Sequence, residues 1–132
     1  MPTVLIVDDE QHIRLLIEQT LEELEDDGVE ILTAVDGEEA IDVVRNHRPQ
    51  LVFLDVSMPK LDGLAVCRAI KGELALADTT VILLTARGQA YDREQGLAAG
   101  ADQYLTKPFD PDDLLHQART ALGLAAEPAR DE

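Results

Sequence analysis

The sequence predicts an α/β fold in which a five-stranded parallel sheet is covered by helices on both faces, a doubly wound arrangement. Short apolar runs recur along the chain, segments with helical periodicity separate them, and the strands begin about 20 to 30 residues apart, as crossover connections require. The chain has 132 residues, of which 45% are hydrophobic. A chain of this size buries enough surface to fold without disulfides or a structural metal, so we expect one globular domain.

Three apolar runs are unbroken by polar residues, which is typical of strands buried on both faces of a sheet. They cover residues 4–7, 51–54 and 81–84. Two further candidates, Val29 to Val35 and Gln103 to Thr106, mix polar and apolar residues. We therefore expect the three apolar runs at the centre of the sheet and the two mixed runs nearer its edges.

Helical periodicity fills the intervals between the strands. The apolar positions that mark the buried faces are Ile13, Leu16, Ile17, Leu21 and Leu24 in a helix ending at Gly28; Ala40, Val43, Val44 and His47 in a helix ending before Pro49; Leu64 to Lys71 in a helix ending at Gly72; and Leu114, Leu115, Ala118 and Leu122 in the last helix. A further helix is expected between about Tyr91 and Ala99. It is alanine-rich and interrupted by Gly96, so we expect it to be the most mobile helix.

The last helix has the strongest terminal signals. Asp110 can cap its first turn, Pro111 suits the first helical position, and Gly123 can end it. We expect the domain to span residues 1–123, and residues 124–132 to form a flexible tail or the start of a linker. The single cysteine, Cys67, is predicted to be a small buried hydrophobe, and a lone cysteine fits a reducing, cytoplasmic compartment.

The formal net charge is −16. Carboxylates in excess repel phosphate, so direct nucleic acid binding is not expected, whereas basic protein surfaces and metal cations are attracted. No apolar run approaches the roughly 20 residues that a membrane span requires, and the N-terminus lacks the basic region of a signal peptide. The charge therefore favours small cations as ligands, and the lack of a long apolar run argues against membrane insertion.

Polar side chains gather at the carboxyl ends of the predicted strands. Asp8 and Asp9 follow the first strand, Asp55 the third and Thr85 the fourth, while Lys107 ends the fifth. In a parallel sheet these ends form one edge, and ligands bind there where the strand order reverses. With the order 2-1-3-4-5 this crevice opens between the first and third strands, which brings the three aspartates together.

Three carboxylates in close contact repel, so they must either take up protons or hold a cation. The available ligands are hard oxygens, with no histidine or thiolate nearby in sequence, so Mg²⁺ or Mn²⁺ fits and zinc does not. Lys107 would then supply a positive charge for the oxygens of a phosphoryl group. Taken singly, Asp9 could be a helix N-cap, Thr85 a turn hydroxyl and Lys107 a solvated charge, but their coincidence at successive strand ends favours a functional site.

Four motifs also carry a family resemblance that covers the chain from Val4 to about Leu122. They are Val7-Asp8-Asp9-Glu10; Leu54-Asp55-Val56-Ser57-Met58-Pro59 followed by Asp62-Gly63; Leu84-Thr85-Ala86; and Gly100-Ala101-Asp102 leading to Tyr104-Leu105-Thr106-Lys107-Pro108-Phe109. Jointly, these motifs resemble those of the receiver domains of two-component response regulators. The resemblance implies a flavodoxin-like (βα)5 fold and a phosphorylation-dependent signalling switch rather than an enzyme.

The resemblance also implies roles for individual residues. Asp55 would be the phosphoacceptor, taking a phosphoryl group from a histidine kinase or histidine phosphotransfer protein. Asp9 and Asp55 would ligate Mg²⁺ through their side chains and Ser57 through its backbone carbonyl, with Asp8 acting through a coordinated water. Thr85 and Lys107 would contact the phosphoryl oxygens. The Lys107–Pro108 peptide bond is expected to be cis, and the residues at positions 57 and 87, which vary in the family, bear on the lifetime of the phosphoryl group.

By the same resemblance, Thr85 and Lys107 would move inward on phosphorylation, and Tyr104 would turn from an exposed to a buried rotamer; a static edge-strand tyrosine is the alternative. The changed surface would comprise the fourth helix, fifth strand and fifth helix. It would serve a downstream partner, an output domain or a phosphorylation-dependent homodimer. Its candidate residues are Tyr91, Arg93, Tyr104 and His116.

An enzymatic alternative is a magnesium-dependent aspartyl phosphohydrolase of the haloacid dehalogenase type, which also uses Asp, Thr or Ser, Lys and Mg²⁺. That class requires Asp-x-Asp directly after the first strand and a cap insertion, whereas Asp8 and Asp9 are adjacent here and no insertion is long enough. An interaction module with an inactive pocket is disfavoured because every pocket residue is present. The absence of a glycine-rich turn after Val7 argues against P-loop and dinucleotide-binding folds.

Overall fold

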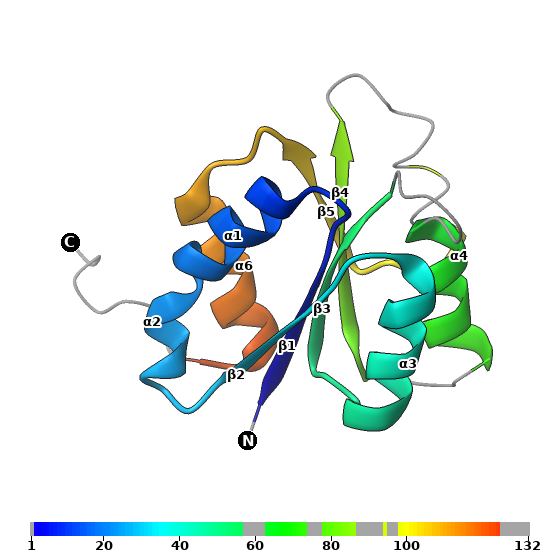
Figure 1. Cartoon of the computed structure of the whole chain (residues 1–132), viewed down its shortest axis with the longest axis horizontal. Coiled ribbons are helices and arrows are strands. Elements are labelled where there is room, and N and C mark those ends of the chain that lie inside the picture. The colour runs from blue at the N-terminus through cyan, green and yellow to red at the C-terminus, as the bar shows by residue number, and fades with distance from the viewer. Residues whose placement is uncertain (1, 57–62, 74–77, 87–93, 95–97, 125–132) are drawn as a thin grey trace.

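The computed structural model describes residues 2–56, 63–73, 78–86, 94 and 98–124. This part of the chain contains one parallel sheet with the strand order β2-β1-β3-β4-β5 (Figure 1). The strands are β1 (Thr3–Val7), β2 (Glu30–Ala34), β3 (Leu51–Asp55), β4 (Thr80–Ala86) and β5 (Gln103–Lys107). The predicted sheet and its order are confirmed, with the two mixed runs at the edges.

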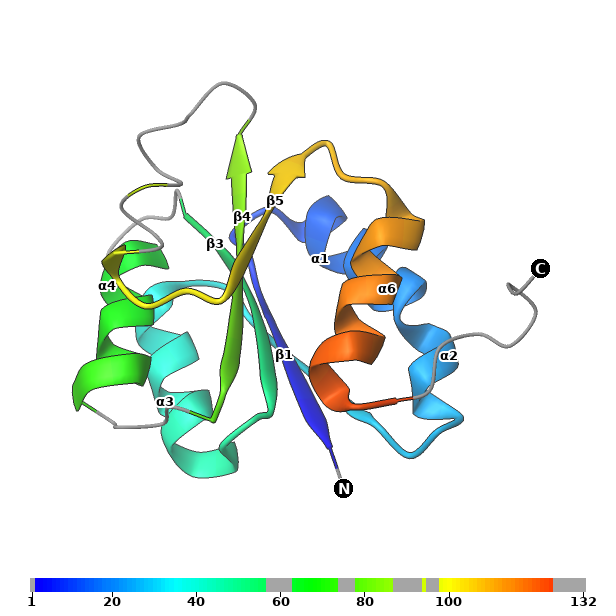
Figure 2. The same ribbon diagram turned by 180° about the vertical axis from the view of Figure 1, so that it is seen from behind.

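Helices cover both faces of the sheet (Figures 1 and 2). One face carries α1 (Gln11–Thr20), α2 (Glu22–Glu25) and α6 (Pro111–Leu122); the other carries α3 (Gly37–His47), α4 (Gly63–Arg68) and the π-helical turn η1 (Ala69–Glu73). Strand β1 pairs with both β2 and β3, so the winding direction reverses between β1 and β3. The helix predicted between Tyr91 and Ala99 falls mostly on residues outside the described part.

The central strands send alternate side chains into two separate cores. In β1, Val4 and Ile6 pack on the side of α1 and α6, whereas Leu5 and Val7 pack on the side of α3 and α4. All four side chains are fully buried. Strands β3 and β4 follow the same rule, which explains why their sequences are apolar without interruption. Figure 2 shows the two helical layers from the opposite side.

The first predicted helix is wrong in its extent and in one residue of its buried face. α1 ends at Thr20, a turn at Leu21 follows, and the four-residue α2 resumes the helix. Leu16 is 40% exposed, because it lies roughly a quarter of a turn from the centre of the stripe formed by Ile17, Leu21 and Leu24. The buried stripe is therefore narrower than the sequence pattern indicated.

The third predicted helix is also wrong at its C-terminal end. α4 runs on into η1, which extends to Glu73, so Gly72 lies inside helical structure instead of ending it. The wider turn places Lys71 where its ammonium donates to the backbone carbonyl of Thr79 and pairs with Asp102. These contacts stabilise a geometry that local sequence alone does not favour.

His47 is wrong as a residue of the buried face of α3, because it is exposed in the last turn of the helix. A basic side chain there interacts favourably with the carbonyl end of the helix dipole. The predictions for α6 and Cys67 are confirmed. Asp110 caps α6 by accepting from the Asp112 amide, and Gly123 ends it with a φ of 72°. Cys67 is fully buried, and burial raises the pKa of its thiol to about 11.

Candidate functional site

The structure brings the three predicted aspartates together at the carboxyl edge of the sheet. Asp8 and Asp9 directly follow β1, and Asp55 is the last residue of β3. Because β1 and β3 pair in parallel with Val7 opposite Leu54, the two strands end side by side. One carboxylate oxygen from each aspartate lies within 4.8 Å of the others. The predicted acidic crevice therefore exists.

The three carboxylates differ in their exposure to solvent. Asp8 is fully buried, Asp55 is 5% exposed, and Asp9 is exposed. The N-cap of α1 is Glu10, so the capping interpretation of Asp9 does not hold. A hard cation suits this all-oxygen set of donors, and such an ion would relieve the repulsion among the carboxylates. The acidic site is thus able to bind a metal ion through Asp8, Asp9 and Asp55.

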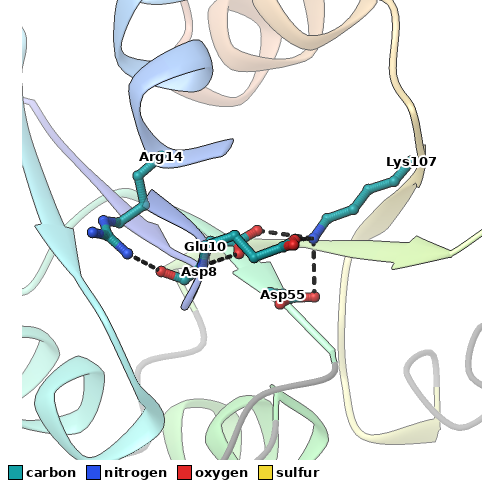
Figure 3. A network of polar contacts seen from close by, with 5 residues as sticks. All are labelled: Asp8, Glu10, Arg14, Asp55 and Lys107. Carbon is teal, nitrogen blue, oxygen red and sulfur yellow. Dashed lines mark hydrogen bonds and ion pairs between the residues drawn. The ribbon is translucent and has the colours of Figure 1, made fainter. Parts of the chain in front are cut away.

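Lys107, at the end of β5, points its ammonium into this acidic crevice (Figure 3). Its Nζ lies 2.9 Å from Asp8 Oδ2, 3.4 Å from Asp55 Oδ1 and 3.7 Å from Glu10 Oε1. Burial alone lowers the pKa of Lys107, but the hydrogen bond to Asp8 and the attraction of Asp55 and Asp8 outweigh it, so the pKa is raised above its usual value. Lys107 is therefore held charged beside Asp55.

Asp8 is fixed by contacts from two neighbouring residues as well as from Lys107. Its Oδ1 accepts from the backbone amide of Glu10 at 2.9 Å, and its backbone carbonyl accepts from Arg14 Nη1 at 2.7 Å (Figure 3). No role was predicted for Glu10 or Arg14 from sequence. The available signal was their position, since Glu10 follows the aspartate pair directly and Arg14 lies one helical turn later on α1.

Thr85 lies on β4, the strand next to β3, and is 1% exposed. Its Oγ1 is buried and has no hydrogen-bond partner within the described part of the chain. Leaving a buried hydroxyl unpaired costs about 1–3 kcal/mol, and such groups are rare enough to suggest a functional role. The hydroxyl is suited to donate to a ligand oxygen bound near Asp55.

The start of α4 packs directly against the end of β3 at Gly63. A Cβ placed on Gly63 would lie 2.2 Å from the Asp55 backbone oxygen, and the Gly63 amide donates to the Val56 carbonyl at 3.0 Å. No side chain fits there without moving the backbone that carries Asp55. Gly63 is therefore a positioning residue of the site, and its motif Asp62-Gly63 was the only sequence signal for it.

The remaining predicted site residues are placed as follows. The Lys107–Pro108 peptide bond is cis. Tyr104 is half-buried and packs against the core on the α3 and α4 side, whereas His116 is exposed on α6, on the other face of the sheet. Ser57, Arg87, Tyr91 and Arg93 lie outside the described residues. Of the predicted partner surface, the structure therefore describes Tyr104 and His116.

Comparison with known proteins gives a consistent family. The family model described as "Response regulator receiver domain" matches residues 4–119. The probable transcriptional regulator ycf27 of Cyanophora paradoxa is 44% identical over 125 residues, which cover 95% of this chain and 50% of that protein. The chain thus spans about half the length of the curated relatives it matches.

Solved structures agree with this assignment. The receiver domain of NtrX from Brucella abortus is 33% identical, with a TM-score of 0.79 and coverage of 92% of this chain and 99% of that one. The chemotaxis protein CheY4 of Vibrio cholerae is also 33% identical, with a TM-score of 0.80 and coverage of 92% and 98%. These comparisons give no support to the aspartyl phosphohydrolase alternative.

The helices in the described part of the chain are all too short or too polar to cross a lipid bilayer.

The fold, the acidic crevice and the comparisons agree with one another. The chain therefore belongs to the receiver domains of the response regulators of two-component systems.

Proposed function

We propose that this domain accepts a phosphoryl group on Asp55 and that phosphorylation switches its surface between two states. The proposal rests on the side chains that lie around Asp55 at the end of β3. The ammonium of Lys107 lies 3.4 Å from its Oδ1, and the buried hydroxyl of Thr85 projects from the adjacent strand. Both groups are suited to bind the oxygens of a phosphoryl group attached to this carboxylate.

Asp55 is better suited than Asp8 as the nucleophile. Asp8 is fully buried, and its two carboxylate oxygens already accept from the Glu10 amide and from Lys107. Asp55 retains 5% exposure at the crevice, so a donor can approach it. In the transfer, a carboxylate oxygen of Asp55 forms a bond to phosphorus while the bond between phosphorus and the donor breaks.

Magnesium fits the acidic cluster, and Mn²⁺ could substitute for it. Asp9 and Asp55 would hold the ion through their side chains, Ser57 through its backbone carbonyl, and Asp8 through a coordinated water. The bound ion would neutralise charge on the phosphoryl oxygens during transfer. Lys107 would leave Asp8 to contact the phosphoryl group, while Asp8 stays fixed by the Glu10 amide. The domain would thereby catalyse its own phosphorylation and dephosphorylation.

The phosphodonor would be a histidine kinase or a histidine phosphotransfer protein in the cytoplasm. Residues 1–123 would form the receiver domain, and residues 124–132 a tail or a linker toward an output domain. The signal would pass to a downstream protein, to that output domain or to a second copy of the chain. Direct nucleic acid binding by this domain is disfavoured by its charge of −16.

The switch would run from Thr85 to Tyr104. When the Thr85 hydroxyl bonds to the phosphoryl group, the space it leaves would be filled by Tyr104, which is now half-buried on β5. Tyr91, Arg93 and His116 would complete the surface that partners recognise. A tyrosine that stays static on the edge strand would contradict this part of the proposal.

Labelling with acetyl phosphate and Mg²⁺ tests the proposed function. We expect an acid-labile adduct with the mass of one phosphoryl group in the wild-type protein, and none in Asp55→Asn. Asp102→Asn is the matched control, since it changes an aspartate that pairs with a lysine far from the crevice. Labelling of Asp55→Asn at the wild-type rate would show that the nucleophile is a different residue.

A further inference from the structure

Glu10 places a fourth carboxylate at the mouth of the acidic crevice. Its Oε1 lies 3.7 Å from Lys107 Nζ, and its side chain is 51% exposed. Lys107 is thus in contact with Asp8 and Asp55 inside the site and with Glu10 at its surface (Figure 3). A donor that approaches Asp55 must pass near the charge of Glu10.

The backbone of Glu10 is fixed even though its side chain is exposed. Its amide donates to Asp8 Oδ1, and its carbonyl accepts from the amides of Ile13 and Arg14 at 3.1 Å each, as the N-cap of α1. The carboxylate can therefore rotate in solvent but cannot leave the neighbourhood of the site. The guanidinium of Arg14 donates to the carbonyl of Asp8, so the only cation that the structure pairs with the Glu10 carboxylate, within the described residues, is Lys107.

The contact between Glu10 and Lys107 is weaker than the two contacts inside the crevice. Asp8 and Asp55 lie closer to Lys107 and raise its pKa, whereas Glu10 lies at the longer distance and its side chain is half in water. Glu10 therefore contributes less than Asp8 and Asp55 to keeping Lys107 charged. What remains for this carboxylate is its effect on other charges that enter the site.

We propose that Glu10 determines phosphodonor selectivity through its charge, an inference that rests on the proposed phosphorylation of Asp55. Its carboxylate repels a free anionic donor and competes with the donor's oxygens for Lys107. A small donor carrying two negative charges is disfavoured most. A phosphohistidine presented by a protein is disfavoured less, because contacts outside the crevice contribute to its binding.

Rates of phosphorylation by two small donors test this inference. With acetyl phosphate, Asp55 forms the new oxygen–phosphorus bond and acetate leaves. With phosphoramidate, which carries one unit less net negative charge, the phosphorus–nitrogen bond breaks and ammonia leaves. We expect Glu10→Gln to react about 3- to 10-fold faster with acetyl phosphate. The gain should be smaller with phosphoramidate and should shrink as ionic strength rises.

Two control variants separate the local charge from other effects. Glu10→Asp keeps the carboxylate and should keep the wild-type ratio of the two donor rates. Glu25→Gln removes the same charge from α2, which precedes β2 and so lies at the other end of the sheet, and should also keep that ratio. A purely structural role of Glu10 in starting α1 would change both donor rates alike.

The outcomes distinguish this inference from the proposed function. If the wild-type protein is labelled on Asp55 but Glu10→Gln leaves the donor ratio unchanged, the role of Glu10 is refuted and the phosphoacceptor stands. A Glu10→Gln variant that is slower with both donors, at an unchanged ratio, also refutes it. If Asp55 is not labelled in the wild-type protein, the proposed function fails and the inference fails with it.

Discussion

The two ends of the sheet each hold a lysine paired with an aspartate at the same distance. At the carboxyl end, Lys107 Nζ lies 2.9 Å from Asp8 Oδ2, and near the amino ends of β4 and β5, Lys71 Nζ lies 2.9 Å from Asp102 Oδ2. Judged by distance alone, the two pairs are equivalent. Their surroundings differ, because one pair is completed by hydrogen bonds and the other lies in the acidic crevice where we propose that phosphorylation takes place.

The pair at the amino end is completed by hydrogen bonds. Lys71 Nζ also donates to the Thr79 carbonyl at 2.5 Å, and Asp102 Oδ2 also accepts from the Val81 amide at 2.9 Å. Gly100, with a φ of +104°, leaves room for the stem of Lys71, since a Cβ there would lie 3.0 Å from Lys71 Cγ. The result is a closed contact between η1 and the starts of two strands.

The pair at the carboxyl end has an excess of negative charge. One ammonium faces Asp8, Asp55 and Glu10, with Asp9 beside them. The nearby hydroxyl of Thr85 has no partner among the residues that the structure describes, whereas Thr79 Oγ1 at the other end donates to the Pro49 carbonyl at 3.0 Å. Unbalanced charge together with an unpaired buried donor therefore distinguishes a ligand site from a structural contact.

Removing each lysine should give the largest contrast. Lys107→Ala leaves the fully buried Asp8 without its cation, so we expect a loss of about 3 kcal/mol of unfolding free energy, partly restored by Mg²⁺. Lys71→Ala leaves Asp102, whose side chain is 44% exposed, so a smaller loss of about 1–2 kcal/mol is expected, with no restoration by Mg²⁺. Urea unfolding with and without Mg²⁺ measures the loss in each variant. Equal losses that do not change when Mg²⁺ is added would contradict the distinction between the two ends of the sheet.

Removing one carboxylate from the carboxyl end should weaken metal binding without destabilising the metal-free protein. Asp9→Ala relieves repulsion, so the metal-free protein should be unchanged or more stable by up to about 1 kcal/mol. Mg²⁺ at ten times its Kd should stabilise the wild-type protein by about 1.4 kcal/mol, and most of this gain should disappear in the variant.

Thermal unfolding with added Mg²⁺ or with a chelator measures this effect. Asp26→Ala serves as the control, because it removes an exposed aspartate that follows α2 and should keep the full metal response. An equal Mg²⁺-induced shift in wild-type and Asp9→Ala proteins would remove Asp9 from the set of metal ligands.

Replacing each of the two buried threonines by valine should give the smallest changes in the free energy of unfolding. Thr79→Val leaves the Pro49 carbonyl without its donor and should cost about 1 kcal/mol. Thr85→Val removes a buried hydroxyl that has no partner among the described residues and so relieves its desolvation cost, and the free energy of unfolding should therefore rise by about 1 kcal/mol. Urea unfolding compares the two; a larger loss for Thr85→Val than for Thr79→Val would mean that the hydroxyl already has a structural role.

The carboxyl end was predicted from sequence because its residues follow a simple rule. Asp8, Asp9, Asp55 and Lys107 come directly after or at the end of predicted strands, and parallel strands bring such positions to one edge. The strand order was a premise of that prediction, and the structure confirms it. Glu10 was missed as a site residue because its effect depends on a contact with a side chain 97 positions away in sequence, at 3.7 Å.

The amino end could not be predicted in the same way. In the η1 turn, Lys71 contacts Thr79 and Asp102, and helical periodicity carries no information about such tertiary contacts. The prediction that Leu16 is buried was wrong for a related reason. Spacing alone does not distinguish an apolar residue beside a buried stripe from one within it. Local patterns thus predicted elements and strand ends, while tertiary contacts set helix ends and the extent of burial.

The most direct test of the contrast is a map of amide NMR shifts on adding Mg²⁺ and beryllofluoride, a mimic of the aspartyl phosphate. We expect large shifts at Asp8, Asp55, Thr85 and Lys107, smaller ones at Tyr104 and His116, and the smallest at Lys71, Thr79 and Asp102. Asp55→Asn should abolish the response. Shifts of similar size at both ends of the sheet, or none at Thr85 and Lys107, would contradict the assignment of the carboxyl end as the phosphoryl site.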